Sequence, residues 1–208
     1  MDRKAHWEDV YQTKAADSVS WFQPVPQPSL DAIGRFGGTP AQSLIDIGGG
    51  ASALVARLAE AGWSNLAVLD ISAPALDVAR AAMGAGGDAV EWIAADITAW
   101  RPARGYDIWH DRAVFHFLTE DPARAGYRAA LAQGLKPGGL LLMATFALDG
   151  PEKCSGLPVQ RYGPAELAAA LGDGFVLLDS WREEHHTPGG STQNFNWCAF
   201  RKAGENAA

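Results

Sequence analysis

The chain has 208 residues, 48% of them hydrophobic and eight of them tryptophan, which is enough to bury a sizeable core and matches the size of one domain. Its formal net charge of -7 at pH 7 argues against a broad binding surface for nucleic acids or anionic membranes. No run of about 18 apolar residues occurs and no apolar leader follows Met1, so we expect no membrane insertion or export and a cytoplasmic location.

Aromatic side chains gather in the first 30 residues. Trp7 and Tyr11 are four positions apart and would share one face of a helix, and Trp21 and Phe22 follow in a proline-rich stretch. Two interpretations stay open, a helix that docks its aromatic face on the core and a flap that covers a ligand. The two are compatible.

Residues 43–52, with the sequence SLIDIGGGAS, are the most informative stretch. A strand predicted over 43–47 contains Asp46 and runs into a glycine loop before a helix predicted over 51–61. Glycine permits backbone conformations that other residues avoid and lets a ligand approach the main chain, while a helix start offers free N–H groups. The stretch predicts a site for a nucleotide cofactor; the alternative is a turn that only tightens the packing of strand on helix. The three loop glycines are Gly48, Gly49 and Gly50.

Two later strands also lead to a carboxylate. The strand predicted over 66–70 ends at Asp70, about 20 residues after the glycine loop, where a ribose-binding acid belongs in a nucleotide-binding βαβ unit. The strand predicted over 90–94 is followed by Asp96. Between them, Ser72 resembles the N-cap of a helix that ends at Met83, and we expect a loop over 84–88.

Further strands are predicted over 106–110 and 139–146, with a helix over 121–134 between them. Two closing strands, starting at Phe175 and Gln193, are joined through a turn rich in glycine. Alternating strands and helices indicate an α/β fold with a doubly wound sheet. Open sheets of this kind bind ligands at the carboxyl ends of their strands, so the acids and the glycine loop should meet there.

The glycine spacing alone does not identify the nucleotide, because Gly48, Gly50 and Ala53 also fit the pattern of dinucleotide-binding enzymes. Asp46 argues against that group, since its charge would face a pyrophosphate but would suit a cationic amino acid moiety. Asp96 is placed to accept a hydrogen bond from an adenine amino group.

At these residues, and at the Pro-Gly-Gly turn over 137–139, the chain resembles the class I S-adenosyl-L-methionine-dependent methyltransferases over about residues 40–147. The resemblance implies a Rossmann-like seven-stranded sheet of order 3-2-1-4-5-7-6 with strand 7 antiparallel. It also implies S-adenosyl-L-methionine as cofactor, with S-adenosyl-L-homocysteine as product, and residues 1–30 as an N-terminal flap like the Trp-x-x-x-Tyr helix of relatives. The cofactor-binding residues implied are Tyr11, Trp21, Asp46, Gly48, Gly49, Gly50, Asp70, Ile71, Asp96, Ile97 and Asp111.

Residues 106–118 hold the catalytic candidates His110, Asp111, Arg112 and His116. The Asp111-Arg112 pair partly resembles thiopurine and tellurite S-methyltransferases, and also lysine methyltransferases that act on elongation factors and citrate synthase. Asp111 would orient the substrate or bind the methionine amino group, and Arg112 would pair with a carboxylate. The alternative is a structural salt-bridge network. The histidines are the candidate bases, although a histidine at 116 more often packs beneath the cofactor.

Residues 148–164 are rich in turns and are expected to form a lid loop within one methyltransferase domain over 1–203. Cys154 lies in this loop and is expected to be a free thiol, as is Cys198, because two cysteines at this spacing match neither a metal site nor a disulfide scaffold. Residues 204–208 are expected to be a disordered tail.

We therefore expect a methyltransferase (EC 2.1.1.-) that acts on a small molecule, with no metal, nucleic-acid or membrane partner. The motifs of amino-group nucleic-acid enzymes and of cytosine C5 enzymes are absent from the sequence. The alternatives are a protein lysine methyltransferase, a non-catalytic cofactor-binding subunit and, last, an NAD-dependent oxidoreductase.

Overall fold

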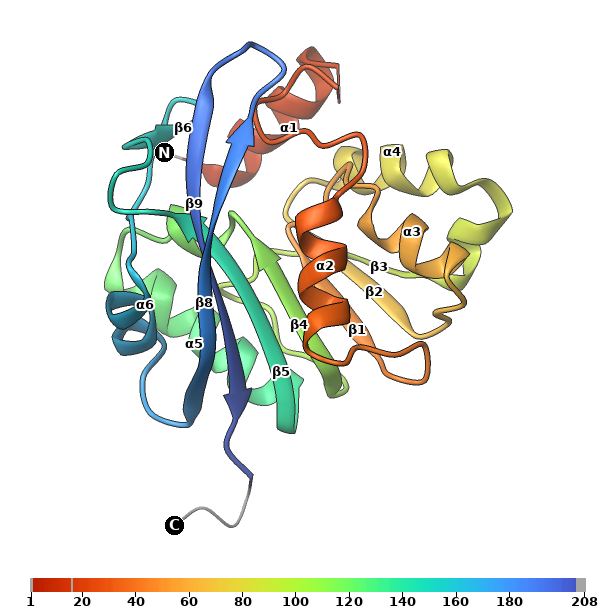
Figure 1. The fold of residues 1–208 in the computed structure, drawn as a ribbon. Coiled ribbons are helices and arrows are strands. Elements are labelled where there is room, and N and C mark those ends of the chain that lie inside the picture. Colours follow the sequence, from red (N-terminus) through yellow and green to blue (C-terminus); the bar gives the residue numbers. More distant parts are fainter. Residues whose placement is uncertain (1, 16, 205–208) are drawn as a thin grey trace.

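The computed structural model describes residues 2–15 and 17–204. A seven-stranded sheet forms its centre and helices cover both faces (Figure 1). The strands are β1 (Leu44–Ile47), β2 (Leu66–Asp70), β3 (Glu91–Ala94), β4 (Tyr106–Arg112), β5 (Leu135–Phe146), β8 (Phe175–His186) and β9 (Thr192–Lys202). The helices are α1 (Arg3–Thr13), α2 (Gln27–Arg35), α3 (Leu54–Glu60), α4 (Ala73–Met83), α5 (Asp121–Gly134) and α6 (Pro164–Leu171).

The order across the sheet is β3-β2-β1-β4-β5-β9-β8. Strands β1 to β5 are parallel to one another, and β9 is antiparallel to both of its neighbours. This is the predicted order 3-2-1-4-5-7-6 with the last strand antiparallel, and the predicted fold class is confirmed. The carboxyl ends of β1 to β4 therefore lie along one edge, which places the segments that follow them side by side.

Two apolar layers hold the helices to the sheet. Side chains of α2, α3 and α4 pack with Leu44 on one face, and side chains of α5 and α6 pack with Ile45 on the other. The split follows from the alternation of side chains along a strand. Asp46 thus shares the face of Leu44, and successive residues near the end of β4 also point to opposite faces.

Several element boundaries differ from the prediction. Residues 84–88 fall in a 3-10 helix, η1 (Gly84–Ala89), instead of a loop, and α3 starts only at Leu54 because the glycine loop continues further than expected. Strand β4 extends to Arg112. Strand β5 begins at Leu135, which pairs with Tyr106, although the four residues that follow loop out around Gly138, whose φ is +72°.

The predicted lid loop contains a small hairpin of β6 (Lys153–Cys154) and β7 (Leu157–Pro158). A second 3-10 helix, η2 (Phe115–Phe117), follows β4. Of the predicted tail, Gly204 is exposed and residues 205–208 lie outside the described part of the chain. Within the described ranges, no helix combines the length and apolarity needed to cross a bilayer.

Candidate active site

A cavity opens at the carboxyl edge of the parallel strands and encloses about 830 Å³ of space, which includes space open to solvent. It collects residues from the ends of β2, β3 and β4, from the start of β9 and from both segments predicted to cover the sheet edge. Its lining residues are Arg3, Trp7, Tyr11, Trp21, Gly48, Leu69, Asp70, Ile71, Ala95, Asp96, Ile97, Arg112, Ala113, Val114, Phe117, Leu118, Cys154, Gln193 and Phe195.

The glycine loop forms one wall, and its shape requires glycine. Gly48 has φ +68°, and a Cβ at this position would lie 2.1 Å from Cγ2 of Val114. Gly50 has φ +41°, and its Cβ would lie 2.7 Å from the hydroxyl of Tyr11 and 3.0 Å from Oδ2 of Asp70. The absence of side chains leaves the backbone of the loop directly against the carboxylate at the end of β2.

Asp70 lies at this edge with its carboxylate almost fully buried. Its Oδ1 accepts a hydrogen bond from the backbone N–H of Ser72 at 2.8 Å, and Ser72 caps α4 as predicted. Burial raises the pKa of Asp70 to about 7, and the nearby charge of Asp46 acts in the same direction. A buried carboxylate is stabilised by hydrogen-bond donors, so a ligand that supplies such donors gains affinity.

Asp96 follows β3 and is less buried. Its Oδ1 accepts hydrogen bonds from the backbone N–H and the hydroxyl of Thr98, at 2.9 and 2.8 Å. Its Oδ2 lies 3.3 Å from Nη2 of Arg3, so this ion pair ties α1 to the end of β3. Asp70, Asp96 and Ile97 therefore line one cavity, and their binding of a cofactor stays a prediction.

Asp46 lies in an adjoining cavity together with Ser29, Gly49 and His110. Tyr11, Trp21, Gly48 and Arg112 line both cavities, so the two cavities meet at these residues. Nδ1 of His110 lies 2.7 Å from Oδ1 of Asp46, and its Nε2 lies 3.0 Å from the hydroxyl of Ser29. Both ring nitrogens of His110 are therefore engaged within the protein.

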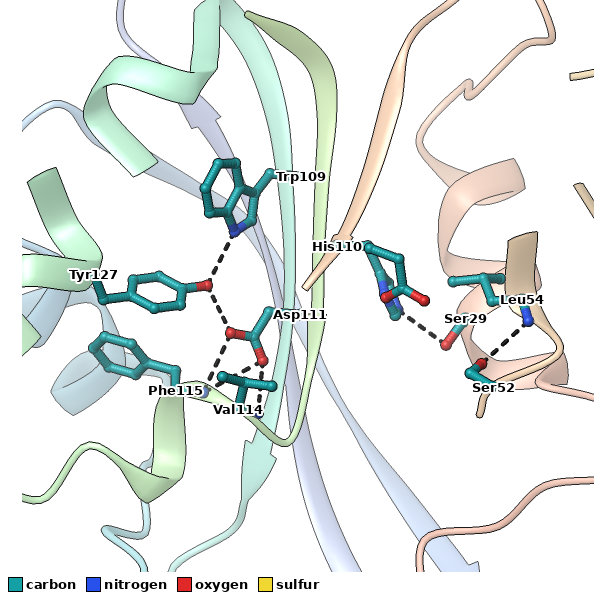
Figure 2. A network of polar contacts seen from close by, with 10 residues as sticks. Ser29, Ser52, Leu54, Trp109, His110, Asp111, Val114, Phe115 and Tyr127 are labelled. Carbon is teal, nitrogen blue, oxygen red and sulfur yellow. Dashed lines mark hydrogen bonds and ion pairs between the residues drawn. The ribbon is translucent and has the colours of Figure 1, made fainter. Parts of the chain in front are cut away.

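Asp111 points to the opposite face of the sheet from His110 (Figure 2). Its fully buried carboxylate accepts hydrogen bonds from the hydroxyl of Tyr127 at 2.6 Å and from the backbone N–H groups of Val114 and Phe115 at 2.9 and 3.2 Å. Burial raises the pKa of Asp111 to about 6. It lines neither cavity, which differs from the expectation that it contacts the cofactor or the substrate.

His116 also packs inside the protein. Its Nδ1 accepts a hydrogen bond from the backbone N–H of Phe146 at 3.2 Å, and burial lowers the pKa of His116 to about 3. The ring is therefore neutral near pH 7, and it does not line the larger cavity. This arrangement matches the packing interpretation and not that of a base in the cavity.

Arg112 is the one of the four catalytic candidates that lines the larger cavity. Its Nη2 donates to Oε1 of Glu183 at 2.8 Å, and its guanidinium lies 4.4 Å from the centre of the Phe195 ring. Glu183 also accepts hydrogen bonds from Gln23 and Trp197. Arg112 therefore forms a structural ion pair and also lines the cavity.

Several lining residues were not predicted from sequence, namely Arg3, Gln193 and Phe195. The last two lie near the start of β9, and only the antiparallel pairing of β9 with β5 brings them to the carboxyl edge. Ser29 and Glu183 were also not predicted, and they reach the site from α2 and from the carboxyl-terminal part of β8. Among the described residues, no group of three His, Cys, Asp or Glu side chains is arranged to hold a metal ion.

Comparison with known proteins agrees with this geometry. A family model described as a methyltransferase domain matches residues 44–139. Trans-aconitate 2-methyltransferase of Azoarcus sp. (strain BH72) is 32% identical over 137 residues, which are 65% of this chain and 49% of that protein. Ubiquinone biosynthesis O-methyltransferase of Aromatoleum aromaticum is 30% identical over 166 residues, 77% of this chain and 64% of that protein. The chain thus spans less than two thirds of the length of either relative.

A solved structure of an S-adenosylmethionine-dependent methyltransferase from Anabaena variabilis has the same fold, with a TM-score of 0.76 over 97% of this chain and 96% of that chain at 14% identity. Its likeness supports the fold, and the residues that the family model matches include the glycine loop. Taken with the strand order and the acids at the carboxyl edge, these matches support a class I S-adenosylmethionine-dependent methyltransferase family for this chain.

Proposed function

We propose that this protein transfers the methyl group of S-adenosylmethionine to a small-molecule acceptor. The observation that carries the proposal is the larger cavity, which joins the carboxylates of Asp70 and Asp96 at one end to Arg112 and aromatic side chains at the other. By their names, both curated relatives are also methyltransferases, one for trans-aconitate and one in ubiquinone biosynthesis.

The residues present fit this cofactor. Gly48 and the buried carboxylate of Asp70 both line the larger cavity, and the lack of a side chain at Gly50 lets Tyr11 and Asp70 lie close to the loop backbone. Asp70 would hold the ribose hydroxyls, and Asp96 with Ile97 would contact the adenine. Asp46, in the adjoining cavity, would bind the ammonium of the methionine part with Gly49 beside it, and Ile71 would lie near the ribose, next to Asp70.

When bound, the cofactor supplies an electrophilic methyl group on a positively charged sulfur. The chain contributes positioning and exclusion of water. Trp7 lies edge-on to Trp21 and Phe117, at ring distances of 5.5 and 5.2 Å, and Arg3 fixes α1 to Asp96. Residues 1–30 would act as a flap and residues 148–164 as a lid, since Cys154 of that segment lines the cavity.

The proposal does not need His110 or His116 as a base. His110 would instead keep Asp46 oriented, and His116 and Asp111 would support the turn after β4. Of the four catalytic candidates, Arg112 is then the residue that would face the acceptor.

The experiment is an assay for S-adenosylhomocysteine formed from S-adenosylmethionine when small metabolites are added in pools. We expect product only with certain pools, and none from an Asp70→Ala variant that is shown to be folded. Cofactor binding without product in any pool would support a non-catalytic subunit instead.

A further inference from the structure

One end of the larger cavity lies away from the two cofactor acids, on the side of β4 and β9. We call this end the acceptor pocket. It is lined by Trp21, Arg112, Phe117, Cys154, Gln193 and Phe195. In the sheet, β4 and β9 lie on the side of β1 opposite to β2 and β3, which carry Asp70 and precede Asp96, so the two ends of the cavity are distinct.

Arg112 and Gln193 line the acceptor pocket, and each carries one buried polar atom that has no hydrogen-bond partner among the described residues. These atoms are Nε of Arg112, which is a donor, and Oε1 of Gln193, which is an acceptor. The side chain of Arg112 is 9% exposed and Gln193 is 7% exposed. Leaving such groups unpaired costs free energy, so a ligand that pairs with them gains affinity.

No side chain of the acceptor pocket is a suitable base near neutral pH. Burial raises the pKa of the Cys154 thiol to about 11, and burial also raises the pKa of Tyr11, which lines the wall toward the glycine loop. Among the described lining residues there is no histidine, and both aspartates belong to the opposite end. An acceptor bound here must therefore present its lone pair without first losing a proton to the protein.

Arg112 further restricts the chemical class of the acceptor. A cationic amine would meet the guanidinium as a like charge and would also need deprotonation, and a phenol or an alkyl thiol would need a base. A carboxylate is already ionised at pH 7 and matches the donor geometry of a guanidinium.

We propose that the methyl acceptor is a small organic carboxylate, with one oxygen held by Arg112 and a hydrogen-bond donor of the same molecule on Oε1 of Gln193. This inference rests on the proposed function. The other carboxylate oxygen forms the new O–CH3 bond with its lone pair while the S–CH3 bond breaks and leaves its electron pair on sulfur. The product is a methyl ester and a neutral thioether, and no proton is released.

The first test uses the full chain with methyl-labelled S-adenosylmethionine and a metabolite extract of bacterial cells. The labelled product is then treated with dilute alkali. Methyl esters release volatile labelled methanol under these conditions, whereas N-, S- and C-methyl groups and ethers do not. We expect the label to become volatile. A base-stable label would refute the carboxylate class while leaving the proposed function intact, and no label from a chain that binds S-adenosylhomocysteine would contradict both.

The second test measures acceptor affinity without turnover, by calorimetry on protein saturated with S-adenosylhomocysteine. The probes are two matched pairs, benzoate with benzamide and cinnamate with cinnamamide. We expect the carboxylates to bind at least about tenfold more tightly than the amides, and Arg112→Gln to weaken their binding by about 10- to 100-fold.

Glu183→Gln is the matched variant, because it keeps the shape of the ion-pair partner and removes its charge. If Arg112 binds the carboxylate, this variant should bind both carboxylates more tightly than the wild type, since the guanidinium no longer shares its charge with Glu183. A purely structural ion pair predicts that Glu183→Gln also weakens binding. Weaker binding in Glu183→Gln, or equal binding of acids and amides to the wild type, would overturn the inference, and neither result depends on whether Arg112→Gln folds.

Discussion

Nδ1 of His110 lies 2.7 Å from Oδ1 of Asp46, and both side chains are buried. The other ring nitrogen lies 3.0 Å from the hydroxyl of Ser29. With a proton on Nδ1 the ring donates to Asp46, and Nε2 pairs with the Ser29 hydroxyl, so the three side chains form a connected chain of hydrogen bonds. The carboxylate proposed to bind the amino group of the cofactor is thereby fixed in orientation.

His110→Phe should weaken the binding of S-adenosylhomocysteine by about tenfold, because the variant removes the hydrogen bond that orients Asp46. Calorimetry with 5′-methylthioadenosine is the control, since this ligand lacks the amino acid part and should bind as well as it does to the wild type. An equal loss for both ligands would point to a general distortion of the site instead.

Asp70 should make cofactor affinity depend on pH. Its pKa is raised by burial to about 7, so the carboxylate is largely protonated at pH 6 and largely ionised at pH 8. If the ionised form binds the ribose hydroxyls, the affinity for S-adenosylhomocysteine should rise about tenfold over this interval, as measured by calorimetry. Asp70→Asn should bind weakly and without this pH dependence.

Asp70 should also affect stability in the unliganded protein. Because its folded pKa is above its unfolded value near 3.8, its contribution to the free energy of unfolding is fully present below about pH 4 and is lost as pH rises toward 7. Asp70→Asn removes this titration. In urea denaturation the variant should therefore be at least as stable as the wild type at pH 8; a marked loss of stability there would contradict the account.

Gly48→Ala should destabilise the protein by about 1 to 3 kcal/mol, since it combines a φ of +68° with a Cβ 2.1 Å from Val114. Gly34→Ala is the matched control. Gly34 lies in α2, and a Cβ there would meet nothing within 4 Å. The control should raise stability by about 0.5 to 1 kcal/mol in thermal or urea unfolding and leave cofactor binding unchanged. Similar effects of both substitutions would contradict a specific role for the glycine loop.

Tyr127→Phe should cost about 1 to 3 kcal/mol of stability, because it removes the hydroxyl that donates to the buried carboxylate of Asp111 at 2.6 Å. Chemical denaturation measures this loss. The folded variant should bind S-adenosylhomocysteine with nearly unchanged affinity. If the variant is as stable as the wild type but binds S-adenosylhomocysteine much more weakly, Asp111 would belong to the cofactor site after all.

The residues proposed to bind the cofactor could be placed together from the sequence because each lies at or just after the carboxyl end of a strand. Asp70, Asp96 and the glycine loop needed only the order of strands and helices to be brought together. The acceptor pocket could not be read in this way, because Gln193 and Phe195 come from β9, which runs antiparallel to the other strands. Their approach to the site depends on pairing between distant segments.

The roles within 106–118 were harder to predict for a different reason. The strand was expected to end at residue 110 but extends to Arg112. Alternation along the extended strand sends His110 and Asp111 to opposite faces, and a shift of one residue would exchange them. Only the structure shows which of the two meets Asp46 and which meets Tyr127.

The most direct measurement of the central claim is thermal unfolding of the wild type and of Asp70→Ala with S-adenosylhomocysteine, NAD or NADP. At about 100 times its dissociation constant, a ligand adds roughly 2.7 kcal/mol of stability. For a domain of this size the midpoint should rise by roughly 5 to 10 °C. The account predicts this rise with S-adenosylhomocysteine alone and its loss in the variant. A rise with NAD or NADP alone, or one that persists in Asp70→Ala, would contradict it.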